Sequence, residues 1–278
     1  MTPEVLNAVE IAAGAWASRD LAAKLLGPTA EYVGAEAASF ARKCNINLND
    51  IFSRAARMLG SKLDEPGQVS PRILKGVVDD GRFADEPIAA EYFAGILASS
   101  RSGRPHDDRG LPMLSVIREL STYQLRLHYI FYSLVKRLYN GRALNLSKRE
   151  ETQLLCVFIP WSMFWTTMQA DPDEEHDLIS HCLNGLFRDR LIGDRYDFAS
   201  PADLTSSRFL GIQEPGLLLE ATEFGAELFL WANGKGDLGL DSFLDSRTVF
   251  RESEDVVIRD GAVRVRFEDE KTAILTIL

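Results

Sequence analysis

The chain has 278 residues, of which 46% are apolar and 26% are charged, and it contains 20 glycines, 11 prolines and 3 cysteines. These values exclude a disordered chain, a collagen-like repeat and a disulfide scaffold, and the length suffices for about two domains. The cysteines, Cys44, Cys156 and Cys182, are odd in number and widely spaced. We therefore expect reduced thiols rather than disulfides, zinc ligands or redox centres.

The sequence predicts neither a secretory signal nor a membrane-spanning helix. The first 17 residues include Glu4 and Glu10 but no lysine or arginine, whereas a secretory signal begins with basic residues. The most apolar run, 154–168, has about 15 residues, fewer than the roughly 20 that span a bilayer. We expect a cytoplasmic protein without a membrane span, in which this run forms a buried helix.

The first hundred residues show helical periodicity. Thr2-Pro3-Glu4 is typical of a helix start, and the apolar repeat is interrupted at Gly27-Pro28 before two further helices, 29–43 and 46–63. Proline at the first helical position predicts two more helices, which begin at Ser70-Pro71 and near Pro87, the first of them ending at Gly81. The polar loop 99–110 then predicts a domain boundary.

The middle of the chain is predicted to contain helices and one short strand. The pattern predicts helices over 111–120, 122–139 with Ser121 as its cap, 147–170, and from the acidic residues 173–175 to Arg190. A strand at 217–221 and a helix at 223–231 follow. This order is compatible with a winged helix-turn-helix module.

The last forty residues change from helical periodicity to short runs typical of strands. Short runs rich in β-branched residues predict strands at 248–250, 256–258, 262–267 and 272–278, with an Asp-Gly hairpin turn at 259–262. The predicted fold class is therefore α+β and mainly helical, with an N-terminal helical region, a winged-helix-like middle and a small C-terminal antiparallel β region. The predicted domains are 1–105, 106–236 and 237–278.

Charge is distributed unevenly along the chain. Residues 101–150 contain 10 basic and 4 acidic side chains, whereas 151–278 contain 11 basic and 24 acidic ones. A basic segment can attract nucleic acid or another polyanion, but an acidic neighbour in the same chain can equally neutralise it. The candidate polyanion-binding residues are Arg101, Arg104, Arg109, Arg118, Arg126, Lys136, Arg137 and Arg142.

The richest polar cluster is the run from His106 to Gly110, with Arg126 and His128 one helix later. Asp107, Asp108 and His128 suggest a metal-dependent hydrolase as one interpretation, although their spacing matches no known metal site. The favoured interpretation is structural: Asp107 or Asp108 caps the helix that begins near Leu111 by accepting from an N–H near Leu111 to Leu114, and pairs with Arg126 or Arg109. His128 lies among aromatic residues and is expected to be a core histidine.

No other motif predicts catalysis or a cofactor. The run 234–239 matches G-x-G-x-x-G, but it follows a helix where a dinucleotide site requires a preceding strand, so we interpret it as a linker. His176 and His181 are predicted to lie on different faces of one helix. The candidate DNA-reading helix, 174–190, is net negative, which disfavours contact with phosphates. We therefore expect no enzyme and no cofactor.

Four stretches resemble the bacterial abortive-infection alpha (Abi-alpha) family: LGPTAEYVG at 26–34, SPRIL at 70–74, DEPI at 85–88 and EYFAGILASS at 91–100. The resemblance covers about residues 20–234. It implies a cytoplasmic bacterial protein linked to phage defence, without catalytic residues to transfer. The leading interpretation is an interaction or regulatory component that acts through a protein partner or self-association. Nucleic-acid binding by 101–150 and the hydrolase at Asp107, Asp108 and His128 are the alternatives.

Overall fold

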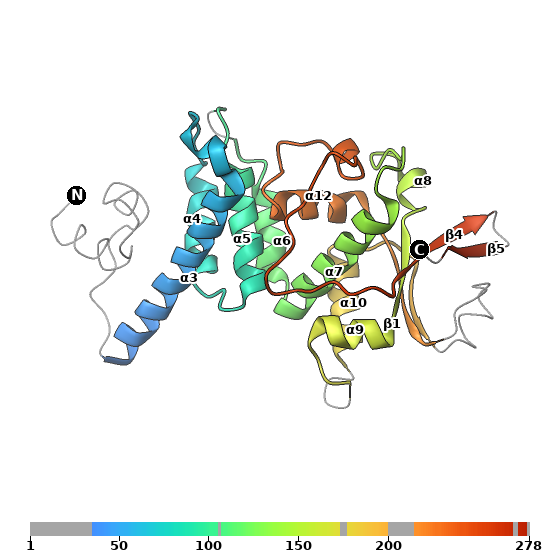
Figure 1. The fold of residues 1–278 in the computed structure, drawn as a ribbon. Coiled ribbons are helices and arrows are strands. Elements are labelled where there is room, and N and C mark those ends of the chain that lie inside the picture. Colours follow the sequence, from blue (N-terminus) through green and yellow to red (C-terminus); the bar gives the residue numbers. More distant parts are fainter. Residues whose placement is uncertain (1–34, 105–106, 173–176, 200–213, 269–271, 277–278) are drawn as a thin grey trace. The chain divides into compact units, whose positions relative to one another are not determined.

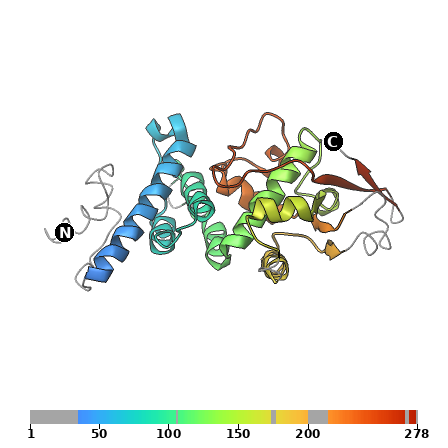
Figure 2. The same ribbon diagram turned by 60° about the horizontal axis from the view of Figure 1, so that its bottom comes forward.

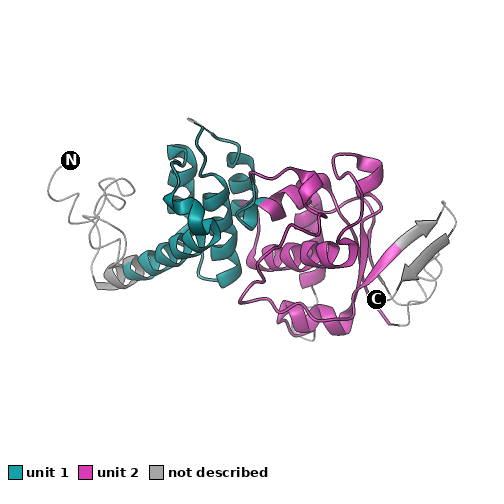
Figure 3. Ribbon diagram, turned by 45° about the horizontal axis from the view of Figure 1, so that its top comes forward, with its two compact units in different colours: residues 1–118, 231–236 teal, residues 119–230, 237–278 magenta. Residues whose placement is uncertain are grey.

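The computed structural model describes residues 35–104, 107–172, 177–199, 214–268 and 272–276 (Figure 1). The chain divides into two compact units, coloured separately in Figure 3. Unit 1 comprises the described residues up to Arg118 together with Trp231–Gly236, and unit 2 comprises Glu119–Leu230 and the described residues from Asp237 onward. The bounds of these units differ from the predicted ranges 1–105, 106–236 and 237–278, because 107–118 and Trp231–Gly236 belong to unit 1.

Unit 1 is helical, and its central element is α5. Its elements are α3 (Ala35–Leu59), the 3-10 helix η2 (Gly60–Asp64), α4 (Pro71–Gly81), α5 (Pro87–Ser99) and α6 (Leu111–Glu119). Every residue of α5 from Ile88 to Ala98 is buried, and the helix contacts both α3 and α4. The predicted helix starts at Pro71 and Pro87 are confirmed.

The prediction of two helices over 29–43 and 46–63 is wrong, because α3 continues through this region as one helix. No glycine or proline stands between Lys43 and Ile46, and Cys44, Leu48, Ile51 and Ala55 keep one buried face in register. The α-helix ends before Gly60, whose φ of 52° favours glycine. The predicted helix that begins at Thr2 lies outside the described residues.

Within unit 1, Gly95 permits a close approach between α5 and the segment Trp231–Gly236. A Cβ atom at Gly95 would lie 1.8 Å from the carbonyl oxygen of Ala232. Four residues further along α5, the Ser99 hydroxyl donates to the carbonyl oxygen of Trp231 at 2.8 Å and accepts from the Gly236 N–H at 3.0 Å. The 234–239 run follows a helix, so the context that a dinucleotide site requires is missing at this position.

Unit 2 combines helices with an antiparallel sheet. Its helices are α7 (Thr122–Tyr139), α8 (Arg149–Thr152), α9 (Trp161–Met168), α10 (Leu178–Arg188), the 3-10 helix η3 (Leu240–Ser242) and α12 (Glu223–Ala232), whose last two residues belong to unit 1. Its strands are β1 (Cys156–Pro160), β2 (Tyr196–Ala199), β3 (Gly216–Glu220), β4 (Val263–Glu268) and β5 (Thr272–Thr276), in the spatial order β2-β3-β1-β4-β5.

Helix α7 packs on this sheet, where it contacts β1 and β4 as well as α9 and α10. Its start is confirmed as predicted: Ser121 accepts from the Gln124 N–H, and the Gln124 side chain accepts from the Ser121 N–H. This capping box fixes the first turn of the helix. The predicted strand at 217–221 and helix at 223–231 are confirmed as β3 and α12.

The prediction of one helix over 147–170 is wrong. Residues Cys156–Pro160 form the central strand β1, with Cys156 opposite Glu220 of β3 and Val265 of β4. All five strand residues are buried. An apolar run that is covered on both sides has no alternation to distinguish it from a buried helix, and Pro160 then ends the strand and caps α9.

The predicted strands at 248–250 and 256–258 and the hairpin turn at 259–262 are also wrong. Residues 246–258 form no strand and run along α7 (Figure 1, Figure 2). The last described strands are β4 and β5, which pair with each other, and β4 also pairs with β1. The C-terminal strands therefore extend the sheet of unit 2.

The mainly helical α+β class is confirmed. The winged-helix arrangement stays a prediction. Among the helices of the described ranges, none combines the length and the apolar character that crossing a bilayer requires.

Candidate functional site

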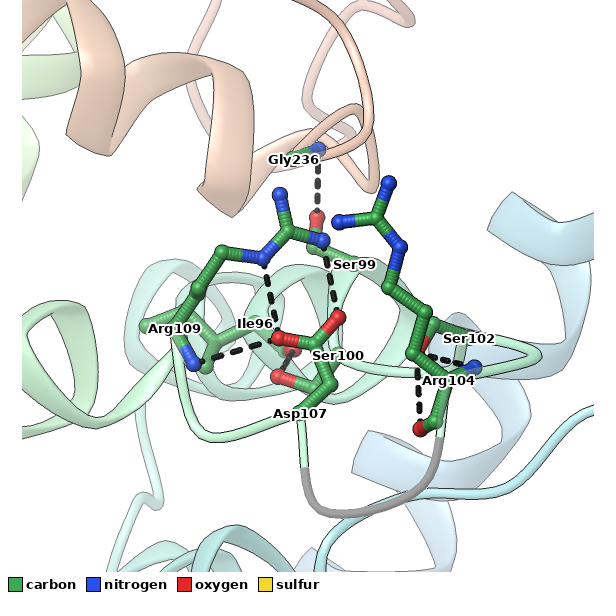
Figure 4. A network of polar contacts seen from close by, with 8 residues as sticks. All are labelled: Ile96, Ser99, Ser100, Ser102, Arg104, Asp107, Arg109 and Gly236. Atoms are coloured by element: carbon green, nitrogen blue, oxygen red, sulfur yellow. Dashed lines mark hydrogen bonds and ion pairs between the residues drawn. The ribbon is translucent and has the colours of Figure 1, made fainter.

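The loop between α5 and α6 contains the polar cluster that the sequence singles out, and Figure 4 shows it from close by. Asp107 accepts hydrogen bonds from Arg109 Nε at 2.9 Å and Nη2 at 2.8 Å, and a longer one from the Arg109 backbone N–H at 3.4 Å. The Asp107 side chain is only 8% exposed. The Arg109 guanidinium holds the pKa of the Asp107 carboxyl well below its usual range.

The neighbouring carboxylate, Asp108, connects the loop to the start of α4. It accepts from the Ser70 hydroxyl, and Arg72 Nη1 lies 3.0 Å from its second oxygen. Ser70 is the residue that precedes the first turn of α4. The backbone carbonyl of Asp108 accepts from the Leu111 N–H at 3.0 Å, so the main chain of the loop contributes to the start of α6.

The predicted pairing of a loop carboxylate with Arg109 is confirmed by Asp107, whereas Asp108 has partners that the sequence did not predict. Neither carboxylate accepts from the first turn of α6 or from Arg126 in the contacts described, since Arg126 pairs with Asp255 within unit 2. The actual partners of Asp108, Ser70 and Arg72, lie 38 and 36 residues away in the sequence. Both carboxylates serve to hold the loop. His106 lies outside the described residues.

The rest of this loop is held through main-chain groups. Arg101 donates to the carbonyl oxygens of Lys62 at 2.7 Å and Leu63 at 3.1 Å, and to that of Glu65. Gln68 and Ser102 exchange two backbone hydrogen bonds of 3.0 Å. Arg101, one of the candidate polyanion-binding residues, therefore closes the C-terminal end of η2 with its guanidinium.

Three other arginines of the basic segment form ion pairs with carboxylates of the same unit. In unit 1, Arg118 lies 2.8 Å from Asp80. In unit 2, Arg126 lies 2.8 Å from Asp255, and Arg137 lies 3.2 Å from Asp260. The side chains of Arg104 and Arg142 are exposed. Arg118, Arg126 and Arg137 were predicted to bind an external polyanion, but in the structure each is paired with a carboxylate of its own unit.

His128 lies in the core of unit 2. The residue has no exposed surface, its Nε2 donates to the Gly225 carbonyl oxygen at 3.1 Å, and its ring packs against Tyr132 and Phe229. Burial lowers the pKa of His128 to about 3, so the ring is neutral at physiological pH. The histidine thus lies inside unit 2, whereas Asp107 and Asp108 belong to unit 1. In the residues that the structure describes, no three His, Cys, Asp or Glu side chains are grouped as metal ligands.

Sequence reasoning missed the acidic partners Asp80, Asp255 and Asp260, and it missed a cavity that Lys136 and Arg137 line. The excess of acidic residues after position 150 was the signal for the two partners in unit 2. It indicated that a neutralising surface existed but not which carboxylates formed it. Comparisons of this chain with protein-family models, with curated proteins and with solved structures found no match.

Proposed function

We propose that this protein is a cytoplasmic interaction or regulatory component of bacterial phage defence that acts by binding a protein partner or a second copy of itself. The resemblance to the Abi-alpha family supports the link to defence. The contacts of the loop between α5 and α6 support binding rather than catalysis, because Asp107 and Asp108 are both engaged by side chains of unit 1.

The single observation that carries this proposal is the paired state of Asp107. A general acid or base needs a proton affinity near the working pH, whereas the bidentate contact with Arg109 keeps this carboxylate ionised over a wide pH range. Asp108 is likewise held between Ser70 and Arg72. Such groups stabilise the shape of a loop, and a loop of fixed shape is suited to recognition by a partner.

The experiment is deletion of the gene from its native context, followed by plating efficiency on a broad phage panel. We expect at least one phage to plate more efficiently on the deletion strain and the intact gene to restore protection. Unchanged plating across the panel would contradict the role in defence.

Complementation with variants separates binding from catalysis. The double variant Asp107→Asn with Asp108→Asn should lose protection only as far as unit 1 loses stability, and the exposed control Asp64→Asn should protect fully. A double variant that folds with parental stability but gives no protection would indicate a catalytic role for the loop instead.

A further inference from the structure

Unit 2 contains a cavity of about 330 Å³ between α7 and the segment 246–258. Helix α7 and its C-cap residue contribute one face to it, formed by Tyr129, Ser133, Lys136, Arg137 and Asn140. The segment 246–258 forms most of the opposite wall. We call this space the Lys136 cavity. Its volume lies at the lower end of the roughly 300–1,000 Å³ of small-molecule sites.

Side chains of unit 2 hold the segment 246–258 in place over the cavity. Tyr129 Oη accepts from the Ser253 N–H at 2.7 Å, and Arg137 Nη2 donates to the Ile258 carbonyl oxygen at 3.3 Å. The Phe250 ring packs against Phe229, with 5.1 Å between ring centres. These anchors at Phe250, Ser253 and Ile258 form the cavity before any ligand binds, which lowers the entropic cost of binding.

The walls of the Lys136 cavity combine a cluster of apolar side chains with polar and charged ones. Tyr129, Phe229 and Phe250 supply aromatic surface, and Val256 is almost fully buried. Val249 and Val257 also line the cavity and are 74% and 70% exposed, so apolar surface continues from the cavity to solvent. This apolar cluster is the part of the cavity that can pack against the hydrophobic body of a ligand.

Lys136 is the charged group beside the aromatic side chains of this cavity. Its Nζ donates to the Asp245 carbonyl oxygen at 2.7 Å and lies 5.4 Å from the centre of the Phe250 ring. The Asp245 carboxylate itself binds Arg247, with 3.0 Å from Nε to Oδ1. Burial lowers the pKa of Lys136, and the negative charge of Asp245 opposes this shift. An ammonium group has three N–H donors, and the carbonyl contact uses one of them.

The two arginines that line the cavity pair with carboxylates, whereas the hydrogen bond of Lys136 goes to a carbonyl oxygen. Arg137 pairs with Asp260 at 3.2 Å, and Arg251 pairs with Glu254 at 3.3 Å. Glu252 lines the cavity as well and is exposed. A ligand with more than one negative charge would meet this carboxylate, which favours a monoanion.

We propose that the Lys136 cavity binds a small hydrophobic carboxylate, whose carboxylate group accepts from Lys136 Nζ while its aromatic or aliphatic body packs against Tyr129, Phe229 and Phe250. The proposal does not depend on a role in defence, because binding is measured on the purified chain. A bound carboxylate would contact both α7 and the segment 246–258 and would therefore stabilise their association.

The test uses 4-phenylbutyrate and its neutral analogue 4-phenylbutyramide in calorimetric titrations of the full chain. The carboxylate should bind about tenfold more tightly than the amide, because only the carboxylate forms a charge-assisted hydrogen bond with Lys136. Lys136→Met keeps the length of the apolar stem but removes the charge, and should abolish this preference. Ser133→Leu fills the cavity from α7, leaves Lys136 in place and should weaken both ligands by about tenfold.

Arg142→Met is the matched control, since Arg142 is exposed, follows α7 and does not line the cavity. This variant should bind 4-phenylbutyrate as the parent does. Absence of binding at about 10 mM 4-phenylbutyrate, equal affinity for the acid and the amide, or parental affinity in Ser133→Leu would each overturn the proposal. If Lys136→Met does not fold, the ligand pair and Ser133→Leu still decide.

Discussion

Arg126 on α7 and Asp255 form an ion pair of 2.8 Å across 129 residues of sequence. The Arg126 side chain is 6% exposed and that of Asp255 18%, so the pair is largely removed from water. Within the described residues, Arg126 Nη1 is buried without a hydrogen-bond partner. The guanidinium therefore depends on this one carboxylate for neutralisation.

Removing the carboxylate should be costly. Asp255→Ala leaves a buried, unpaired guanidinium, and we expect the free energy of unfolding of unit 2 to fall by about 3 kcal/mol. Asp260→Ala is the matched control, because Asp260 pairs with Arg137 on the same helix but is fully exposed, and its loss should change stability by less than about 1 kcal/mol. Urea unfolding of both variants measures the difference. Equal effects would show that burial does not set the strength of the Arg126 pair.

Replacing Gly95 with alanine should destabilise unit 1, although alanine has the higher helix propensity. In an isolated helix, Gly→Ala stabilises by about 1 kcal/mol. In unit 1, the added Cβ would lie 1.8 Å from the Ala232 carbonyl oxygen, which is a backbone atom that cannot rotate away. Gly95→Ala should therefore destabilise unit 1 by more than about 2 kcal/mol. Gly103→Ala, with no atom within 4 Å of its added Cβ, is the control. Amide exchange in α5 measures the effect, and slower exchange in Gly95→Ala would contradict the close approach.

The elements that the sequence predicted correctly have local causes. The start of α7 follows from Ser121 and Gln124, three residues apart, and the start of α5 follows from Pro87. The central strand β1 has no such cause, because its partners in β3 and β4 are separated from it by about 60 and more than 100 residues. Its apolar run suits a buried helix and a buried strand equally. Pairing with β3 and β4 makes these residues a strand, and those partners are distant in the sequence.

Partners that are distant in the sequence also explain the conformation of the segment 246–258 and the contacts of the polar loop. Residues 248–250 and 256–258 have the composition of strands, but the Ser253 N–H and the Ile258 carbonyl are bound by Tyr129 and Arg137 of α7. Side chains more than 120 residues away thus replace a strand partner. In the loop, the sequence identified Asp107 and Asp108 as structural, yet the distance from Asp108 to Ser70 and Arg72 hid its partners.

Asp107 should contribute to the stability of unit 1 in a pH-dependent way. Its folded-state pKa is depressed by Arg109, so the contribution is complete above the unfolded value near 3.8 and is lost as the pH falls below it. At neutral pH, Asp107→Ala should cost about 1–3 kcal/mol, since it removes a charge-assisted bidentate contact. The exposed Asp64→Ala should stay within about 0.5 kcal/mol of the parent. Urea unfolding at neutral pH tests this, and equal stability of the two variants would argue against a structural Asp107.

His128 also makes the stability of unit 2 fall as the pH decreases, but this loss begins at a higher pH, near 6.5. Burial lowers its pKa from 6.5 to about 3 in the folded state, so below pH 6.5 the unfolded chain binds a proton that the folded chain does not. The unfolded state then binds more protons, and stability falls as the pH decreases, by up to about 1.4 kcal/mol per pH unit.

His128→Leu removes this contribution while keeping an apolar side chain in the core. The difference in unfolding free energy between parent and variant should shrink by about 1.4 kcal/mol from pH 7.5 to pH 5.5. The other histidines and all carboxylates are common to both proteins and cancel in this difference. Parallel pH curves would mean that His128 gains a proton in the folded state, which its contact with the Gly225 carbonyl inside the aromatic core opposes.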